Sequence, residues 1–196
     1  MNDDRFLVSG WDDDTQDIDE TRNPTDELEK RILDACENGR LEEVQKILES
    51  RPDLVGARDK DGYTPLHRAC YSNSIEVVKY LIEFGADIGA KTEVQWQPLH
   101  SCCQWNHKEC AWLLIQNGAD VNAQSEGSQT PLHIAASHGA NYETVQLLLN
   151  HPYIDASIKN NSGETAADLA KRGSKYYNIF EVVDPLLDYK NLEMLK

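Results

Sequence analysis

A four-residue motif recurs in this chain at a constant interval and restricts the folds open to it. The motif is Thr-Pro-Leu-His at residues 64–67 and 130–133, and Gln-Pro-Leu-His at residues 97–100, so successive copies begin 33 residues apart. A related segment, Thr-Ala-Ala-Asp at residues 165–168, begins 35 residues after the third copy. A unit of this length cannot bury an apolar face alone, so neighbouring units must stack to build a core. The sequence therefore predicts a repeat array.

Each motif has the features of a helix start. Thr64 and Thr130 can cap a helix, and the proline that follows each of them would occupy the first helical position, where its missing N–H costs nothing. Small residues one turn later would let this short helix pack closely against a second, antiparallel helix rich in valine and leucine. Turn-forming residues before each motif predict a projecting hairpin tip. Gln95 and Gln97 replace the glycine and threonine of other units, so the third unit is expected to be the least regular.

The pattern resembles the ankyrin repeat, whose 33-residue unit carries Thr-Pro-Leu-His, and the resemblance runs from about residue 32 to about residue 172. It implies an all-α solenoid of about five stacked helix-turn-helix units with short hairpin tips. The expected divisions are an N-terminal capping unit at 25–58, three full repeats at 59–159 and a C-terminal capping unit at 160–185. An acidic, disordered tail is expected at 1–24 and a short tail at 186–196.

The charge of the chain disfavours several classes of partner. The chain has 19 Lys and Arg against 34 Asp and Glu, a formal net charge of -15, and such a charge repels phosphate backbones and anionic lipids. The first residues carry acids where a secretory signal needs bases. We therefore expect an intracellular protein of the cytoplasm, the nucleus or both, monomeric alone, without direct nucleic-acid binding or membrane insertion.

Histidines and cysteines gather in the third unit, where a zinc site must be weighed. They are His100, Cys102, Cys103, His107 and Cys110. In the repeat alignment, however, the cysteines occupy positions that other units fill with alanine or valine, so packing in the core explains them better. The motif histidines recur beside helix starts, which predicts hydrogen bonds that tie turn to helix. We expect no metal, no cofactor and no enzymatic activity.

The resemblance implies a concave face formed by the hairpin tips and the first helices. Several residues there are not explained by packing, and they are the predicted partner-binding set: Tyr63, Tyr71, Trp96, Gln104, Trp105 and His138. Aromatic side chains of this kind are enriched in interface hot spots. Four basic residues, Arg58, Lys60, Arg68 and Lys91, are expected to give this patch a positive rim, which favours an acidic and apolar partner segment. The alternative is that the aromatic rings only stiffen the tips.

The N-terminal tail joins apolar residues to acids in one short motif. Its members are Phe6, Leu7, Trp11, Asp12, Asp13 and Asp14. Such segments fold on binding and include acidic activation-type segments. Three interpretations remain open: the motif binds another protein, it lies back on the concave face, or it is an inert solubilising tail. The first supports an alternative function, that of a nuclear transcriptional regulator acting through the tail, beside the main prediction of a non-enzymatic adaptor.

Two further residues carry hypotheses. Asn122 resembles the asparagine that intracellular asparaginyl hydroxylases modify in ankyrin repeats, although it can also simply bond its own turn. Trp112 falls at a position that is Lys79 and Gln146 in neighbouring units. It is therefore expected on the convex side, either as a second contact or as a docking point for the tail.

Overall fold

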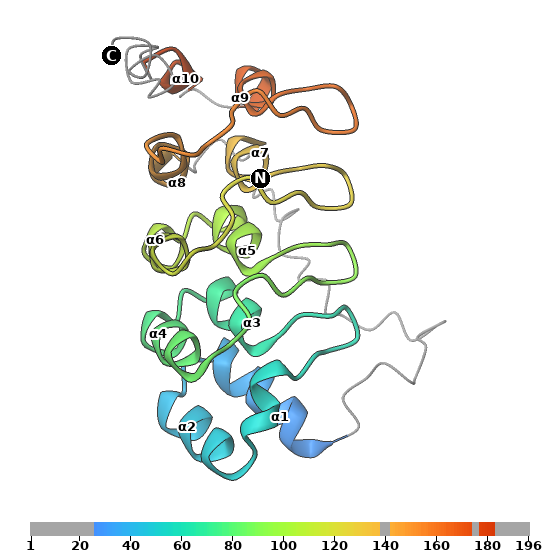
Figure 1. Ribbon diagram of the computed structural model, residues 1–196, viewed down its shortest axis with the longest axis vertical. Helices are drawn as coiled ribbons and strands as arrows, with labels where there is room; N and C mark the ends of the chain where they lie inside the picture. Colours follow the sequence, from blue (N-terminus) through green and yellow to red (C-terminus); the bar gives the residue numbers. More distant parts are fainter. Residues whose placement is uncertain (1–25, 138–141, 174–176, 183–196) are drawn as a thin grey trace, which may run out of the picture.

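The structure is a computed structural model that describes residues 26–137, 142–173 and 177–182. Pairs of helices stack along one axis (Figure 1), and the described residues contain no strand. The elements are α1 (Glu27–Glu37), α2 (Leu41–Ser50), the 3-10 helix η2 (Pro52–Gly56), α3 (Pro65–Tyr71), α4 (Ile75–Phe84), α5 (Pro98–Gln104), α6 (Lys108–Gln116), α7 (Pro131–Ser137), α8 (Tyr142–Leu149), α9 (Ala166–Gly173) and α10 (Ile179–Val182). The predicted all-α ankyrin solenoid is confirmed. The tail motif at 6–14, His138 and the short tail at 186–196 lie outside the described residues.

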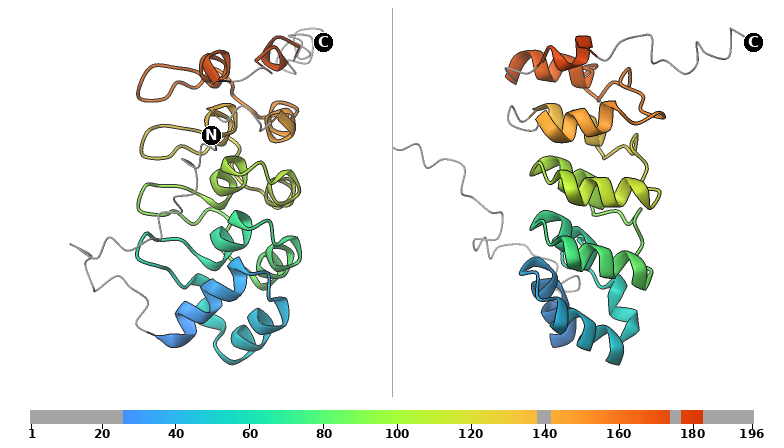
Figure 2. Two further views of the ribbon diagram at one scale, coloured as in Figure 1. Left: turned by 180° about the vertical axis from the view of Figure 1, so that it is seen from behind. Right: turned by 90° about the vertical axis from the view of Figure 1, so that its left-hand side faces the viewer.

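Two columns of helices build the core. The first helices of the units, α1, α3, α5, α7 and α9, pack on one another, and the second helices α2, α4, α6 and α8 form a parallel column. Figure 2 shows the hairpin tips projecting from the side of the first column, away from the second. The buried core includes one leucine from each motif and one from each second helix: Leu66, Leu99, Leu132, Leu48, Leu81, Leu114 and Leu148. The concave face therefore consists of the first helices and the tips.

The motif residues cap their own helix and bind the next unit. Thr64 accepts a hydrogen bond from the His67 N–H, and the Nδ1 atom of His67 accepts the Thr64 N–H at 3.2 Å. Because Nδ1 is an acceptor, the ring proton lies on Nε2, which donates to the carbonyl oxygen of Trp96 at 3.1 Å. His100 and His133 make the same Nε2 bond to Gln129 and Glu164, also at 3.1 Å. The predicted role of the histidines in tying turn to helix is confirmed, and they also tie one unit to the next.

Neighbouring hairpin tips are joined through their backbones. The Glu93 N–H donates to the Asp61 carbonyl and the Glu126 N–H to the Val94 carbonyl, both at 3.0 Å. One position in each tip has a positive φ: Gly62 (82°), Gln95 (64°), Ser128 (53°) and Gly163 (76°). This left-handed conformation is costly for residues other than glycine. Gln95 and Ser128 both adopt this conformation without being glycine, so the third unit is not less regular than the fourth at this position.

The five cysteines are free thiols and all are buried. Burial raises the pKa of the Cys36 and Cys103 thiols, so both stay protonated. Their predicted role in core packing is confirmed. In the described residues no group of three or more His, Cys, Asp or Glu side chains is placed to hold a metal ion. No helix in this part of the chain has the length and apolar character needed to cross a membrane.

Candidate functional site

A hollow of about 320 Å³ opens on the concave face, between the second and third units. Its lining consists of Asp61, Tyr63, Arg68, Tyr71, Trp96, Ser101, Gln104 and Trp105. Five of the six residues predicted to bind a partner are in this lining. The sixth, His138, lies outside the described residues. The tips supply Asp61, Tyr63 and Trp96, whereas α3, α5 and the residue after α5 supply the rest.

The aromatic rings of this hollow make defined contacts. Tyr71 and Trp105 meet edge to face, with ring centroids 5.3 Å apart and planes at 83°. Trp96 stacks on His100 with a centroid separation of 6.0 Å and planes at 23°. Trp96 is partly buried against the core, but Trp105 keeps 49% of its surface exposed. The rings are therefore held in place by the array and still reach solvent.

Asp59 organises the tip on one side of the hollow. One of its carboxylate oxygens accepts the backbone N–H groups of Asp61 and Tyr63, both at 2.9 Å. The other oxygen accepts the Arg68 guanidinium at 2.5 Å, and Glu37 of α1 lies 3.3 Å from the same guanidinium. The Arg68 guanidinium also lies over the Tyr63 ring, 5.3 Å from its centroid. A single, largely buried carboxylate thus fixes the backbone of both Asp61 and Tyr63.

The positive rim predicted from the sequence is wrong for Arg68. Only 6% of the Arg68 side chain is exposed, and its charge is matched by Asp59 and Glu37. Arg58 is also held against the chain, where it donates to the carbonyls of Gly62 at 2.9 Å and Lys91 at 2.7 Å. Asp61, in contrast, is an exposed carboxylate in the lining of the hollow. The lining itself therefore carries one acid and one base, Asp61 and Arg68.

Ser101 is a residue of this site that the sequence prediction missed. It occupies the position in α5 that Arg68 occupies in α3 and Ile134 in α7, directly after the histidine of each motif. The small side chain leaves space between bulkier neighbours, and its hydroxyl is buried without a hydrogen-bond partner in the described part of the chain. The motif alignment itself contains the signal, because a serine stands where adjacent units have long side chains.

A second hollow, of about 510 Å³, lies along the hairpin tips. Its lining consists of Tyr63, Val94, Trp96, Ser125, Glu126, Gly127, Gln129, Ile134 and Asn161. It shares Tyr63 and Trp96 with the first hollow, so the two lie side by side on the concave face. Together they can accept an extended segment rather than a single small molecule.

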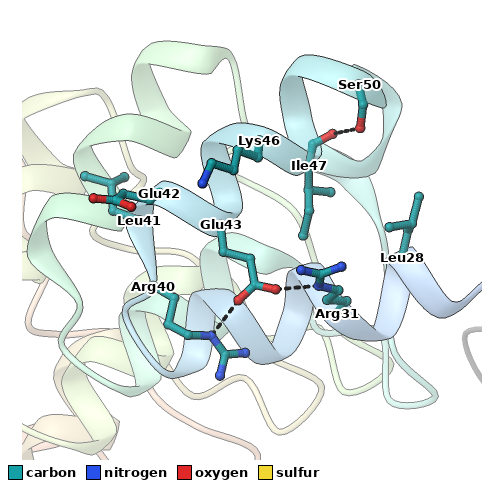
Figure 3. A pocket seen from close by; sticks show the side chains of 9 residues that line it. All are labelled: Leu28, Arg31, Arg40, Leu41, Glu42, Glu43, Lys46, Ile47 and Ser50. Carbon is teal, nitrogen blue, oxygen red and sulfur yellow. Dashed lines mark hydrogen bonds and ion pairs between the residues drawn. The ribbon is translucent and has the colours of Figure 1, made fainter.

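A third hollow, of about 750 Å³, lies on the N-terminal helix pair (Figure 3). Glu43 accepts hydrogen bonds from both Arg31 and Arg40, the latter at 2.8 Å. Three of the charged side chains in this hollow, Arg31, Arg40 and Glu43, are thus directed at one another. Mixed polar and apolar residues of this kind suit the end of a stack, which must face water because no further unit covers it.

The side chain of Asn122 bridges two units. Its Nδ2 donates to the Tyr153 carbonyl at 2.8 Å, and its Oδ1 accepts the Asp155 N–H at 2.9 Å. The side chain of Asn122 therefore bonds the turn of the next unit rather than its own turn, and hydroxylation of Asn122 stays a prediction. Trp112 on α6 is 49% exposed, as expected for the second helix of the unit.

Comparisons with known proteins agree with this architecture. Family models described as ankyrin repeats (3 copies) and ankyrin repeats (many copies) match residues 32–125 and 114–170. Ankyrin repeat domain-containing protein 49 of Drosophila melanogaster is 56% identical over 177 residues, which cover 90% of this chain and 82% of that protein. The proteins of the same name from Homo sapiens and Mus musculus are 57% and 60% identical, over 78% and 79% of this chain. The matched residues span 64% and 65% of these two mammalian relatives.

The matches cover the motif-bearing units and the hollow between the second and third of them. Ankyrin units are protein-interaction modules. By sequence and by structure, the chain belongs to the ankyrin repeat family.

Proposed function

We propose that this protein is a non-enzymatic adaptor that holds a segment of a partner protein in the hollow between its second and third units. The observation that carries the proposal is the convergence of Tyr63, Tyr71, Trp96 and Trp105 on one solvent-accessible hollow. Aromatic side chains fixed by a rigid scaffold lose little conformational entropy on binding, so they contribute strongly to affinity. The neighbouring hollow along the tips extends the contact to a segment of several residues.

Packing within the chain does not explain these rings fully. Trp105 makes its aromatic contact with Tyr71 but remains half exposed, and an exposed indole is costly in water. The concave placement distinguishes Trp105 from Trp112, which is equally exposed at 49% but lies on the opposite column. These two tryptophans form a matched pair for an experiment.

The experiment compares Trp105→Ala with Trp112→Ala in quantitative affinity capture from cells that express the tagged chain. Both variants remove one half-exposed indole, so both should melt within a few degrees of the unaltered chain. We expect Trp105→Ala to lose the principal captured protein and Trp112→Ala to keep it. Equal capture by the Trp105→Ala and unaltered chains would contradict the proposal.

A further inference from the structure

The hollow on the N-terminal helix pair has no role in the adaptor proposal. It lies at the end of the stack (Figure 1), where α1 and α2 have a neighbouring helix pair on one side only within the described residues. At about 750 Å³ it is larger than either hollow on the concave face. Its lining includes Leu28 and Leu41, which are only partly buried. Partly exposed leucines in a concave surface favour contact with another apolar group, because the contact removes them from water.

The chain enters the folded units at one side of this hollow. Asp26 is fixed there by two contacts, because it accepts the Leu28 N–H at 2.9 Å and pairs with Arg51 at 3.0 Å. Leu28 and Ser50 both belong to the lining. Figure 3 shows these two residues on the same side of the hollow, with Arg40 on the opposite side. The segment that precedes Asp26 therefore joins the array directly beside the hollow.

That segment carries an apolar cluster that its own composition cannot bury. Four of the six residues from position 6 to position 11 are apolar, namely Phe6, Leu7, Val8 and Trp11. They occur in a segment, residues 1–25, that has eight acids and two bases, a composition that does not build a core. A single aromatic side chain can bury about 150–250 Å². Burial of this cluster therefore requires a surface outside the segment.

The length of the connection suits the hollow. Eleven residues, 15–25, separate the tail motif at 6–14 from Asp26. A flexible chain of this length spans about 17–20 Å on average, and α1, with 11 residues, is about 16 Å long. When the average span of a connection matches the distance to be bridged, the effective concentration reaches the millimolar range. Even a contact with a dissociation constant of about 1 mM is then half occupied.

The charges of the hollow nearly balance. Its charged lining residues are Arg31, Arg40, Glu42, Glu43 and Lys46. The two arginines share Glu43, and Arg40 also pairs with Asp34 outside the lining. Lys46 is exposed and forms no ion pair with another described residue. Burial of apolar side chains must therefore supply most of the affinity, and Lys46 is the cation that can orient an acidic segment.

We propose that the tail motif, residues 6–14, docks in the hollow of its own N-terminal helix pair. The apolar side chains of the motif cover Leu28 and Ile47, and the carboxylates of residues 12–14 face Lys46. The first unit of the array thereby gains a cover that no other described segment provides. This placement leaves the concave face open to a partner, so the inference goes beyond the adaptor proposal and does not rest on it.

Paramagnetic NMR on the 196-residue chain tests this placement. A nitroxide label on Ser9→Cys broadens the amide signals of nearby residues, and labelling is selective because the five native cysteines are buried. We expect signal loss at Arg31, Glu43 and Ile47, which line the hollow, and none at Gln104 on the concave face. Reduction of the nitroxide with ascorbate restores all signals and gives the reference intensities.

A mixed sample distinguishes docking within one molecule from contact with a second copy. It contains nitroxide-labelled chain without ¹⁵N and ¹⁵N-labelled chain without nitroxide, at the same total concentration. Because docking occurs within each molecule, the ¹⁵N-labelled chain should lose no signal at the hollow.

Two pairs of variants identify the contacts. Trp11→Ser should weaken docking about tenfold or more, whereas Ile18→Ser, which lies outside the tail motif, should leave the signal loss unchanged. Lys46→Glu places a carboxylate against those of the motif and should weaken docking about threefold or more. Lys79→Glu, at an exposed lysine of α4, changes the net charge equally and should have no effect.

Any of four results would overturn the inference. They are signal loss centred on Gln104, equal signal loss in the mixed sample, the absence of any localised signal loss, and full signal loss in the Trp11→Ser or Lys46→Glu chain. Capture of a partner by the Trp105→Ala and Trp112→Ala chains is measured separately, so the adaptor proposal can fail while the tail docks, and the reverse.

Discussion

The Nε2–H of His67 donates a hydrogen bond of 3.1 Å to the backbone carbonyl of Trp96, and so links the helix of one unit to the aromatic tip of the next. The bond holds the backbone that carries an indole of the hollow. Because His100 and His133 repeat it, the array is joined by buried neutral rings along the whole concave side. The stability of the stack and the shape of the hollow therefore depend on the same histidines.

This arrangement predicts a loss of stability in mild acid. Burial lowers the pKa of His67 and His100 to about 4 from an ordinary value of 6.5. Between these values the unfolded chain binds more protons than the folded chain, so unfolding becomes easier as the pH falls from about 6.5 towards about 4. Full loss would amount to about 3 kcal/mol for each ring. Urea unfolding at a series of pH values measures this change.

The variant His67→Gln removes one titrating ring and should reduce the pH dependence in that window, even though it also lowers stability at pH 7. An NMR titration of the His67 and His100 ring protons provides an independent measurement. Titration of either ring near pH 6.5 in the folded chain would contradict the interpretation.

The Arg68–Asp59 ion pair is expected to contribute more to stability than a surface pair. Asp59→Asn keeps an acceptor for the tip backbone but leaves Arg68 buried with less compensation, so the free energy of unfolding should fall by about 3 kcal/mol. The matched control is Asp53→Asn, which breaks an exposed pair with Arg51 at 2.8 Å and should cost much less, because water screens the two charges. Equal losses in urea unfolding would show that burial of the Arg68 pair has no special effect.

Two glycines with similar φ angles, Gly62 and Gly163, provide a test of how closely neighbouring tips approach one another. Gly62 and Gly163 both have positive φ, but a Cβ at Gly62 would lie 3.1 Å from the Glu93 nitrogen and the Thr92 Cα, whereas a Cβ at Gly163 meets nothing within 4 Å. Alanine at either site costs about 1 kcal/mol for its conformation. Gly62→Ala should lose about 1–3 kcal/mol more in thermal or urea unfolding. Equal losses of unfolding free energy in the two alanine variants would mean that the tip carrying Thr92 and Glu93 can move away from the added methyl group without cost.

Ser101→Ile should not destabilise the fold. The change removes a buried hydroxyl without a partner in the described chain and adds apolar surface beside existing aromatic rings. Its unfolding free energy should equal or exceed that of the unaltered chain. Cys102→Ile, one residue further in the same helix, enlarges a fully buried side chain and should lose about 1–3 kcal/mol. A comparable loss in both variants would show that the space at Ser101 is not available.

The periodic features of the fold were predictable because they depend on local chemistry. The helix starts at Pro65, Pro98 and Pro131, the histidine bonds and the buried cysteines all follow from a motif repeated in register. The five described aromatic and amide residues of the hollow were found because the motif left them unexplained. Local pattern alone, however, does not give the charge of their surroundings.

The burial of Arg68 was not predicted, because Arg68 was expected at the exposed rim of the hollow. Its burial depends on Glu37, 31 residues upstream, and on Asp59 in the tip, and neither contact is implied by the motif. The space at Ser101 likewise depends on side chains in adjacent units. Both features require the units to be stacked in three dimensions before they can be recognised.

Site-specific photo-cross-linking shows whether a partner protein occupies the hollow between the second and third units. A photoreactive amino acid is placed at Gln104, in the lining of the hollow, or at Gln116, exposed near the end of α6 on the other column. We expect position 104 to form a covalent adduct with a partner in cells. Trp105→Ala should remove this adduct, and position 116 should not form it. An adduct formed equally from position 116, or one at position 104 that survives Trp105→Ala, would contradict the account.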